Sequence, residues 1–491
     1  MIYWALSLVL YTISFPPFSV PYLIFFAFVP VLLVVGRYTY RRVFTLFFVW
    51  GVVFNTIHVH WILHLQVPAG IERLLIVGLL AMVVYLSIFY GLIGIGFKYG
   101  MERSPFFLPA FWVLVEFARS YGDLGFPWSP LWESLLRNLT MYQISRFLGP
   151  FGVSFFIILT NVLFALSVLR SKKIYLITGI LLFTTLEFLG FSIKRQPLNI
   201  EGSVKVAIFQ PNVLPRYQDN PEEWQETFEA YSELNNSFEG DPDLIVFSES
   251  SLPGYYRLSR NAKKVVSEIL SKHRSYILLG TADYEIVSKN SYKLYNAALL
   301  ISPDGAIINR FYKTHLVPFG EWLPFEDKIP LLRKINVGQG DYTPGKDLRP
   351  LTIKCSRAGI LICFESIFPE ISRKETYFGA NILINITNDG WFGRSLGPVE
   401  HFYLAIFRAI ENQRFLVRAA KTGISAIISP DGKVLKKLPQ FKRGVIVSDV
   451  PLISGETFFT KHGNWMVTVS LLMALLLVAY NSAKKITRHG G

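Results

Sequence analysis

Long apolar runs fill the first 193 residues, with short polar connections between them, and a further apolar run lies near the end of the chain. A helix needs about 20 apolar residues to cross a hydrocarbon core of roughly 30 Å. The six clear candidates are residues 20–36, 43–64, 74–97, 151–169, 174–193 and 464–480. Residues 2–15 are short and residues 105–121 contain a glutamate, so these two runs are weaker candidates. The pattern predicts a bundle of about eight transmembrane helices.

The pattern changes from residue 204, where short β-rich runs alternate with polar segments of helical spacing. The runs typical of strands are residues 204–212, 243–250, 276–285, 296–305, 351–355, 359–365, 381–389 and 423–432. Most are apolar on both faces, which favours sheets that are covered on both sides. Residues 221–234, 260–273 and 398–414 have helical spacing, and the first and third begin at proline, a favoured first helical position. We predict an α/β domain with helices outside packed sheets.

These patterns divide the chain into three parts. Residues 1–193 are expected to form seven transmembrane helices, residues 194–460 an extramembrane α/β domain, and residues 461–491 a last transmembrane helix with a basic tail. The composition, 51% hydrophobic and 15% aromatic, is too apolar for a soluble protein. The formal charge of +14 could indicate a nucleic-acid partner. We expect none, because the clustered Lys and Arg lie beside apolar runs and are not interleaved with base-stacking aromatics.

The distribution of basic residues predicts the orientation of the bundle. An even number of spans places both ends of the chain on one side of the membrane, and Lys and Arg are enriched on the cytoplasmic side. The basic residues on that side of an eight-span arrangement are Arg37, Arg41, Arg42, Lys98, Arg103, Arg170, Lys172, Lys173, Lys484, Lys485 and Arg488. Those on the opposite side are fewer: Arg119, Arg137, Arg146, Lys194 and Arg195. We expect cytoplasmic termini and an α/β domain on the extracytoplasmic face.

The chain has two cysteines, Cys355 and Cys363. A disulfide is the first possibility for a domain outside the cytoplasm. A hairpin around residues 356–359 would place Cys355 opposite Ile360 and Cys363 opposite Thr352. The two sulfurs would then be offset by about three residues, or roughly 10 Å at about 3.3 Å per residue, which is too far for a disulfide bond. We therefore predict that Cys363 is a free thiol.

Three polar residues occur near the ends of predicted strands: Glu249, Lys313 and Cys363. Chains that leave the same edge of a sheet bring distant residues into one pocket, where α/β active sites usually form. Each residue alone is more often structural, since a buried Cys packs as a small hydrophobe and a charged residue at a strand end is usually solvated. Together they supply a nucleophile, a base and a cation, as acyl transfer through a thioester requires.

The histidines favour no metal site. The chain has eight of them, and His58 and His60 lie two residues apart in a predicted membrane segment. We interpret these two as polar groups at a helix end, because a zinc site needs three or four donors. We expect neither a metal nor another cofactor.

The segments around these three residues resemble a known family. Glu249 in FSESSLP, Lys313 in FYKTHLVPFGEWLPF and Cys363 in ICFES are similar to the Glu-Lys-Cys triad of the nitrilase, or carbon-nitrogen hydrolase, superfamily. The flanking residues more specifically resemble the apolipoprotein N-acyltransferase family, in LVPFGEWLP, in NDGWFGRSLGPVEHF and in the order of seven helices, a domain and one last helix. The resemblance covers nearly the whole chain and extends to FPPF at 15–18, HWI at 60–62 and GFPW at 125–128.

The resemblance implies a nitrilase-like αββα sandwich and a role for each triad residue. Glu249 would be the general base, Lys313 would stabilise the tetrahedral intermediate, and Cys363 would be the nucleophile. None of these roles follows from spacing alone.

The resemblance also implies three supporting residues. Glu321 and Glu365 match acidic positions that support the site, and Trp391 matches an aromatic in a loop that guards it. Glu365 could alternatively hydrogen-bond a turn only. Two positions depart from the family, since Phe364 stands where Tyr is expected and residues 216–217 read Arg-Tyr where Lys-Trp is expected.

The implied function is transfer of a fatty acyl chain from a membrane phospholipid, through a thioester on Cys363, to the N-terminal α-amine of an S-diacylglyceryl-cysteine lipoprotein. We expect a monomer that is integral to the bacterial cytoplasmic (inner) membrane, with its catalytic domain on the periplasmic face. One alternative is a membrane-tethered nitrilase or amidase that hydrolyses a small amide. Another is a transporter or lipid-binding scaffold with an inactive domain, against which the intact triad argues.

Overall fold

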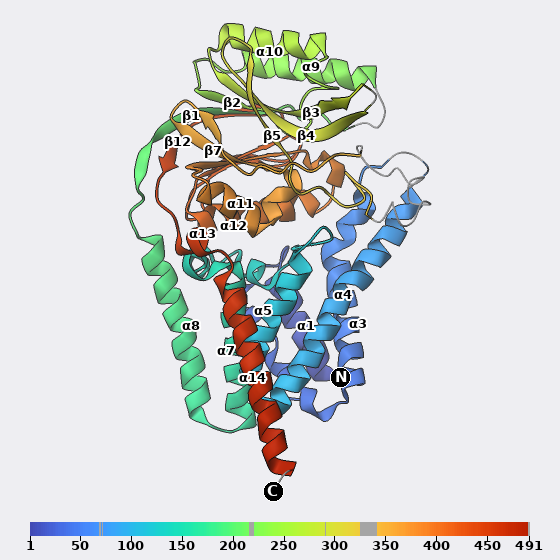
Figure 1. Ribbon diagram of the computed structural model, residues 1–491, viewed down its shortest axis with the longest axis vertical. Coiled ribbons are helices and arrows are strands. Elements are labelled where there is room, and N and C mark those ends of the chain that lie inside the picture. Colours follow the sequence, from blue (N-terminus) through green and yellow to red (C-terminus); the bar gives the residue numbers. More distant parts are fainter. Residues whose placement is uncertain (68–69, 71, 216–219, 290, 325–340, 490–491) are drawn as a thin grey trace. The chain divides into compact units, whose positions relative to one another are not determined.

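The computed structural model describes the chain except residues 68–69, 71, 216–219, 290, 325–340 and 490–491. The described residues form two compact units (Figure 1). The helical bundle comprises Met1–Ile62, Ile76–Gln196 and Lys461–Gly491. The sandwich unit comprises Leu63–Leu75 and Pro197–Thr460.

The bundle contains helices of very different length. Its main helices are α1 (Ile2–Ser14), α3 (Tyr40–Val59), α4 (Glu72–Arg103), α5 (Phe107–Ser120), α7 (Ser145–Leu169), α8 (Lys173–Lys194) and α14 (Trp465–His489). Five helical segments in the described part of the chain are long and apolar enough to cross a membrane. They are Tyr40–His64, Glu72–Arg103, Ser145–Leu169, Lys173–Lys194 and Trp465–Ala483. Ile2–Ser14 and Pro21–Arg37 are apolar but shorter.

The predicted span at residues 20–36 corresponds to the apolar helical segment Pro21–Arg37, which is not one continuous helix but is broken into three short ones. These are η1 (Pro21–Phe25), α2 (Val29–Leu32) and η2 (Val35–Arg37), and prolines lie at the starts of the first two. Proline lacks an N–H and disfavours helix at the residue before it. The side chain of Asn161 on α7 satisfies the freed backbone groups, since its Oδ1 accepts from Phe28 N–H (2.9 Å) and its Nδ2 donates to Ile24 O (2.9 Å).

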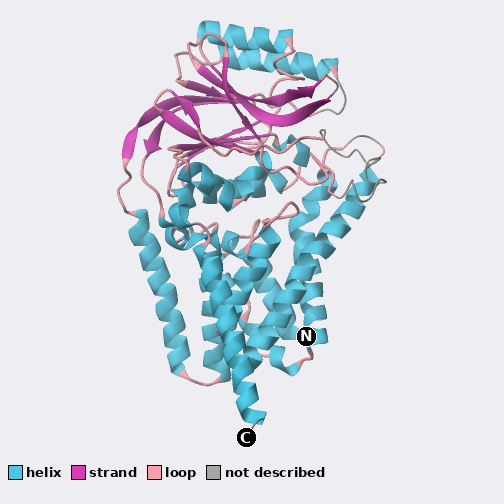
Figure 2. Cartoon of the chain, viewed as in Figure 1, coloured by secondary structure: helices cyan, strands magenta, loops and turns pink. Residues whose placement is uncertain are grey.

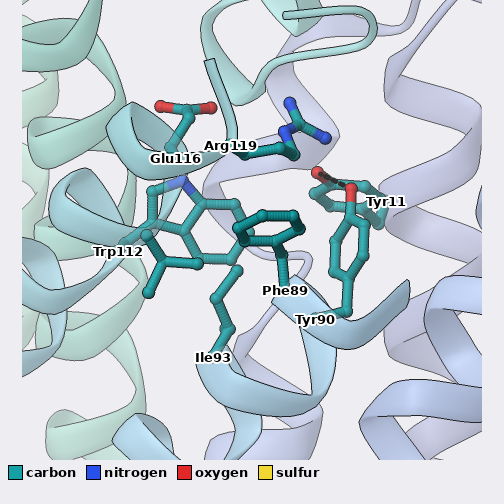
Figure 3. A pocket seen from close by; sticks show the side chains of 8 residues that line it. Tyr11, Phe89, Tyr90, Ile93, Trp112, Glu116 and Arg119 are labelled. Carbon is teal, nitrogen blue, oxygen red and sulfur yellow. Dashed lines mark hydrogen bonds between the residues drawn. The ribbon is translucent and has the colours of Figure 1, made fainter. Parts of the chain in front are cut away.

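Glu116, which weakened the prediction of a span at residues 105–121, has a structural partner. It lies in the 14-residue helix α5 and is 3% exposed, and its Oε1 accepts a hydrogen bond from Leu131 N–H (2.6 Å). With Arg119 it lines a small pocket whose other walls are mainly aromatic (Figure 3). The hydroxyls of Tyr11 and Tyr90 hydrogen-bond in this pocket at 3.2 Å. The glutamate therefore fastens the loop after α5 to that helix.

The sandwich unit contains two six-stranded sheets (Figure 2). The first has the order β12-β1-β2-β3-β4-β5, with bounds Gly444–Ile453, Ile200–Gln210, Leu244–Val246, Tyr276–Ser288, Ser291–Ile301 and Ile307–Tyr312. The second has the order β11-β10-β9-β8-β7-β6, with bounds Val434–Leu438, Ser425–Ile428, Leu416–Ala420, Ile382–Thr387, Ser356–Ile362 and Leu351–Ile353. The sheets pack against each other through apolar side chains contributed by both.

Helices cover the outer faces of both sheets. They are α9 (Pro221–Asn236) and α10 (Arg260–Lys272) on the first sheet, and α11 (Pro369–Tyr377) and α12 (Gly397–Asn412) on the second (Figures 1 and 2). Strand β4 shows why the strand sequences are apolar at successive positions. Its residues Ala298 and Leu300 lie in the core between the sheets, whereas Leu299 and Ile301 lie in the core under the helices. Both faces of the strand are buried, so the nitrilase-like αββα arrangement that we expected is confirmed.

The register predicted between the two cysteine-bearing strands is wrong. β6 pairs with β7 with Ile353 opposite Ser356, so the turn contains only Lys354 and Cys355. The expected pairs, Cys355 with Ile360 and Cys363 with Thr352, therefore do not form. Both cysteines are nevertheless free, Cys355 being exposed and Cys363 half-buried.

Candidate active site

The three residues of the predicted triad all lie just beyond strand ends. Glu249 follows β2 by three residues, Lys313 directly follows β5, and Cys363 directly follows β7. β2 is parallel to β3, and β5 has the same direction because it is antiparallel to β4, which is antiparallel to β3. β2 and β5 therefore end at the same edge of the first sheet. The second sheet reaches this edge at the residue after β8, where Asn388 N–H donates to Glu249 Oε2 (2.8 Å).

Glu249, Lys313 and Glu321 form one buried cluster, each at most 4% exposed. Lys313 Nζ lies 2.9 Å from Glu321 Oε1 and 3.5 Å from Glu249 Oε1. Asn296 on β4 joins the two carboxylates, since its Nδ2 donates to Glu249 Oε1 (2.8 Å) and to Glu321 Oε1 (2.7 Å). Val317 N–H donates to Glu321 Oε2 (2.8 Å). Each charged group thus has partners that compensate for its burial.

A glycine allows the Glu249 loop to pack closely on β3. A Cβ atom at Gly280 would lie 2.4 Å from Ser248 O and 2.7 Å from Glu249 Cα. Only glycine leaves room for this approach, so Gly280 fixes the position of the Glu249 backbone.

The cluster keeps Lys313 charged and leaves Cys363 protonated at rest. Burial alone would lower the pKa of Lys313, but the carboxylates of Glu321 and Glu249 outweigh it and raise that pKa well above its usual range. Burial, and then Glu249, raise the pKa of the Cys363 thiol well above its usual range, and Lys313 opposes them. The thiol therefore needs a base to accept its proton when it reacts.

Cys363 begins a 3-10 turn, Cys363–Ile367, with a backbone φ of 51°. The predicted strand at residues 359–365 therefore ends at Ile362, three residues early and just before the thiol. The left-handed conformation is uncommon for a residue other than glycine and is found at functional sites.

Glu365 connects the Cys363 turn to the Lys313 loop. Its Oε2 accepts from Ile362 N–H (2.8 Å), just before Cys363, while its Oε1 accepts from Thr314 N–H (2.7 Å) and from the Thr314 hydroxyl (2.7 Å). Burial raises the pKa of Glu365, and these hydrogen bonds oppose the rise. The reading that Glu365 only bonds a turn is too narrow, because the carboxylate joins two segments of the site.

A second polar cluster supports the Cys363 turn from the side of α12. His401 Nε2 lies 3.1 Å from Cys363 O and 3.0 Å from Ser366 Oγ, and His401 Nδ1 lies 2.9 Å from Asp389 Oδ1. Arg418 donates to Asp389 Oδ2 (2.9 Å). Burial alone would raise the pKa of Asp389, but Arg418 and His401 outweigh it and hold that pKa at about 2. Burial, with Arg418, lowers the pKa of His401.

The structure places the remaining predicted residues around this centre. Trp391 lies in the 3-10 turn Asp389–Phe392 that follows β8, is half-buried, and its carbonyl accepts from Gln66 N–H (2.8 Å). The ring of Phe364 packs edge-on against that of Phe368, with centroids 5.1 Å apart. The Arg-Tyr departure at residues 216–217 lies outside the described residues.

Sequence reasoning missed three residues of the site. Asn296 is the first residue of the predicted strand at 296–305 and lies in the middle of β4, on the face that becomes the core between the sheets, and a polar residue on that face is a usable signal. Asn388 was noted only as part of the NDGWFG motif, yet its backbone N–H donates to Glu249. Nothing in the spacing of His401 points to Cys363, because the contact depends on how α12 packs. Among the described residues, no group of three His, Cys, Asp or Glu side chains is arranged to hold a metal ion.

Two protein families match the chain. The carbon-nitrogen hydrolase family matches residues 205–457, and the apolipoprotein N-acyltransferase N-terminal domain matches residues 7–163. An apolipoprotein N-acyltransferase of Geobacter metallireducens is 33% identical, over 99% of this chain and 95% of that protein. Proteins of the same name from Shewanella oneidensis and Haemophilus ducreyi are 29% and 28% identical over 86% of this chain, and over 82% and 84% of their own lengths.

Proposed function

Because this chain belongs to the apolipoprotein N-acyltransferase family, we propose that it moves a fatty acyl chain from a membrane phospholipid, through a thioester on Cys363, to the N-terminal α-amine of a diacylglyceryl-cysteine lipoprotein. The observation that carries the mechanism is the placement of one buried cation, Lys313, between Glu249 and Glu321 and in electrostatic contact with Cys363. This arrangement supplies a base, a nucleophile and a fixed positive charge at one point.

In the first step Glu249 accepts the proton of the Cys363 thiol, and the sulfur attacks the carbonyl carbon of the phospholipid ester. Lys313 balances the negative charge that develops on the carbonyl oxygen. The ester C–O bond then breaks, and protonated Glu249 returns its proton to the departing alcohol of the lysophospholipid. Because the pKa of the Cys363 thiol is raised, the proton should move to Glu249 while the sulfur attacks, and no thiolate should form beforehand.

In the second step the lipoprotein α-amine attacks the thioester carbonyl. Glu249 takes the proton lost by the nitrogen, Lys313 again balances the oxyanion, and the C–S bond breaks. The thiolate of Cys363 recovers its proton from Glu249, and the amide product leaves. A membrane enzyme suits both substrates, because each methylene withdrawn from lipid into water costs about 0.8 kcal/mol.

Mass analysis of the intact protein tests this mechanism directly. After incubation of the purified chain with phospholipid vesicles, we expect a fatty-acyl adduct on Cys363, which a lipoprotein-derived diacylglyceryl peptide then removes. Cys363→Ser should form no hydroxylamine-sensitive adduct, and Cys355→Ser, which alters the other cysteine, should form it normally. Release of ammonia from a small amide without any acyl adduct would favour the membrane-tethered amidase and overturn the proposal.

We also propose cytoplasmic termini, a periplasmic sandwich unit and a monomer. The exposed thiol of Cys355 provides a natural reporter of orientation. A membrane-impermeant maleimide added to cells with a permeabilised outer membrane should label Cys355. It should not label Ser171→Cys in a Cys355→Ser background. Residue 171 lies in the exposed connection between α7 and α8, which the proposed orientation places in the cytoplasm, where the reagent does not reach. The reverse labelling pattern would overturn this orientation, and light scattering in detergent would measure the mass of the particle.

A further inference from the structure

The hairpin of β3 and β4 extends past the catalytic residues, and one of its faces is continuous with the site. Asn296 pairs across the hairpin with Ala282, Leu294 with Tyr284, and Tyr292 with Ile286. Alternate residues of a strand share a face. Asn296 lies on the face that carries Ala298 and Leu300 in the core between the sheets, so the two further pairs lie on that face too.

We call Tyr284, Ile286, Tyr292 and Leu294 the hairpin strip. All four have large apolar or aromatic side chains. Tyr284 and Leu294, nearest the site, are half-buried, whereas Ile286 is 75% exposed and Tyr292 is 66% exposed. Large side chains exposed to this degree on adjacent strands form an apolar surface of the kind that marks a binding site.

The loop that carries Glu249 borders the strip on its other side. Ser251 N–H donates to Gly280 O (2.9 Å), and Tyr255 forms a bridge with Ala282, so this loop follows β3 outward. The ring of Tyr255 packs edge-on against that of Tyr284, with centroids 5.7 Å apart. Tyr255 therefore widens the apolar surface beside the strip.

The strip begins beside the catalytic cluster and leads outward from it. Asn296 contacts both Glu249 and Glu321. From Asn296 to Tyr292 the strand advances four residues, or about 13 Å at roughly 3.3 Å per residue. An apolar group attached to the reacting carbonyl would leave the cluster beside Tyr342, whose N–H donates to Glu321 O (2.9 Å), and continue along this face.

We infer that the hairpin strip binds the fatty acyl chain of the donor while that chain is attached to Cys363. The inference rests on the proposed function, in which an apolar chain must occupy the protein between the two steps. A lipid surface is a poorer fit for the hairpin, because its turn carries Ser288, Lys289 and Ser291, all exposed and polar. The exposed apolar residues instead concentrate on the face that leads from the active site.

The tip of the hairpin offers a matched control. Val287 follows Ile286 in the sequence, is 57% exposed, and lies at the irregularity of the β3–β4 pairing between Ile286 and Ser288, so it belongs to none of the pairs that form the strip. Substitution of Val287 changes the same hairpin with a similar loss of apolar surface but leaves the strip intact.

The test compares acyl chains of different length. Acylation of Cys363 would be followed by intact-protein mass analysis, with 4-carbon and 16-carbon 4-nitrophenyl esters at concentrations below saturation. For Ile286→Ser/Tyr292→Ser we expect acylation by the 16-carbon ester to fall about tenfold, equivalent to about 1.4 kcal/mol, with the 4-carbon rate unchanged. Val287→Ser should resemble the wild type with both esters.

Three outcomes would overturn the inference. The double variant could acylate at the wild-type rate with the long ester, it could lose both rates equally, or Val287→Ser could lose the long-chain rate to the same extent. The last result would assign the whole hairpin tip to contact with lipid.

A second measurement separates the strip from the reaction. In Cys363→Ser, a 16-carbon fatty acid that bears a photoreactive diazirine should cross-link to residues 284–294, and Ile286→Ser/Tyr292→Ser should reduce this labelling. If the wild type forms no acyl-enzyme but the label maps to the strip, the proposed function is refuted and the strip is still a binding site for an acyl chain. If the acyl-enzyme forms and the label maps elsewhere, only the inference about the strip is refuted.

Discussion

Replacing Lys313 by Met should destabilise the sandwich unit as well as abolish turnover. The cation lies 2.9 Å from Glu321 and 3.5 Å from Glu249, and all three side chains are buried. At an effective dielectric constant of about 20, unit charges at these separations attract by about 6 and about 5 kcal/mol. Desolvation cancels much of this attraction, and removal of one partner from a buried ion pair costs about 3–5 kcal/mol. We expect a loss of stability in that range.

A double variant separates stability from catalysis. Lys313→Met leaves two buried carboxylates without their cation, and adding Glu321→Gln removes one of these charges while keeping its shape. The double variant should therefore recover part of the lost stability. It should not recover acylation of Cys363, because no cation remains to balance the oxyanion.

Thermal unfolding in detergent and intact-protein mass analysis measure the two properties on the same samples. Glu321→Gln alone serves as the control for the second substitution. If Lys313→Met unfolds at the wild-type temperature, the reasoning about buried charge is wrong. If the double variant forms the acyl-enzyme at a wild-type rate, Lys313 has no part in the chemistry.

Three further predictions follow from contacts in the two units. Gly280→Ala places a Cβ atom 2.4 Å from Ser248 O, so we expect slower acylation of Cys363, by at least tenfold, in a protein that still folds; a wild-type rate would show that the Glu249 loop adapts. Asp389 has its pKa held at about 2, below its ordinary 3.8, so it stabilises the fold above about pH 4. This contribution, on the order of 2 kcal/mol, should be lost as the pH falls from 4 to 2, and Asp389→Asn should flatten that part of the stability profile measured by chemical unfolding. Glu116→Ala leaves Leu131 N–H without its acceptor in the bundle, which should cost about 1–3 kcal/mol by thermal unfolding in detergent, whereas Glu116→Gln should retain most of the stability.

The sandwich and the edge that carries the candidate site were predictable because they depend on strand alternation and strand direction. Runs that are apolar on both faces require covering layers, and strands that run the same way deliver Glu249 and Lys313 to one edge. The identity of the partner residues required the family resemblance. Geometry alone does not distinguish a nucleophilic Cys363 from one that fills the core.

The errors have a common physical origin in backbone detail. Pro21 and Pro30 interrupt an apolar run whose composition is that of a span, and hydropathy does not register the break. The left-handed conformation of Cys363 ends β7 at Ile362, three residues before the predicted end, and nothing in the letters ILICFE marks this turn. Asn296 was overlooked because its importance depends on the face that it occupies.

The backbone conformation of Cys363 also bears on how the protein would change if selection for its activity were relaxed. A non-glycine residue held at φ 51° costs on the order of 1 kcal/mol that glycine would not. Cys363→Gly relieves this strain but loses the packing of the Cys363 side chain against the core between the sheets, so we expect a protein that still folds and forms no acyl-enzyme. Under the proposed mechanism, selection for activity is what would keep a cysteine at a position where glycine adopts the same backbone conformation without strain. The residue at this one position thus offers a way to tell working members of such a family from descendants that have kept the fold for another purpose.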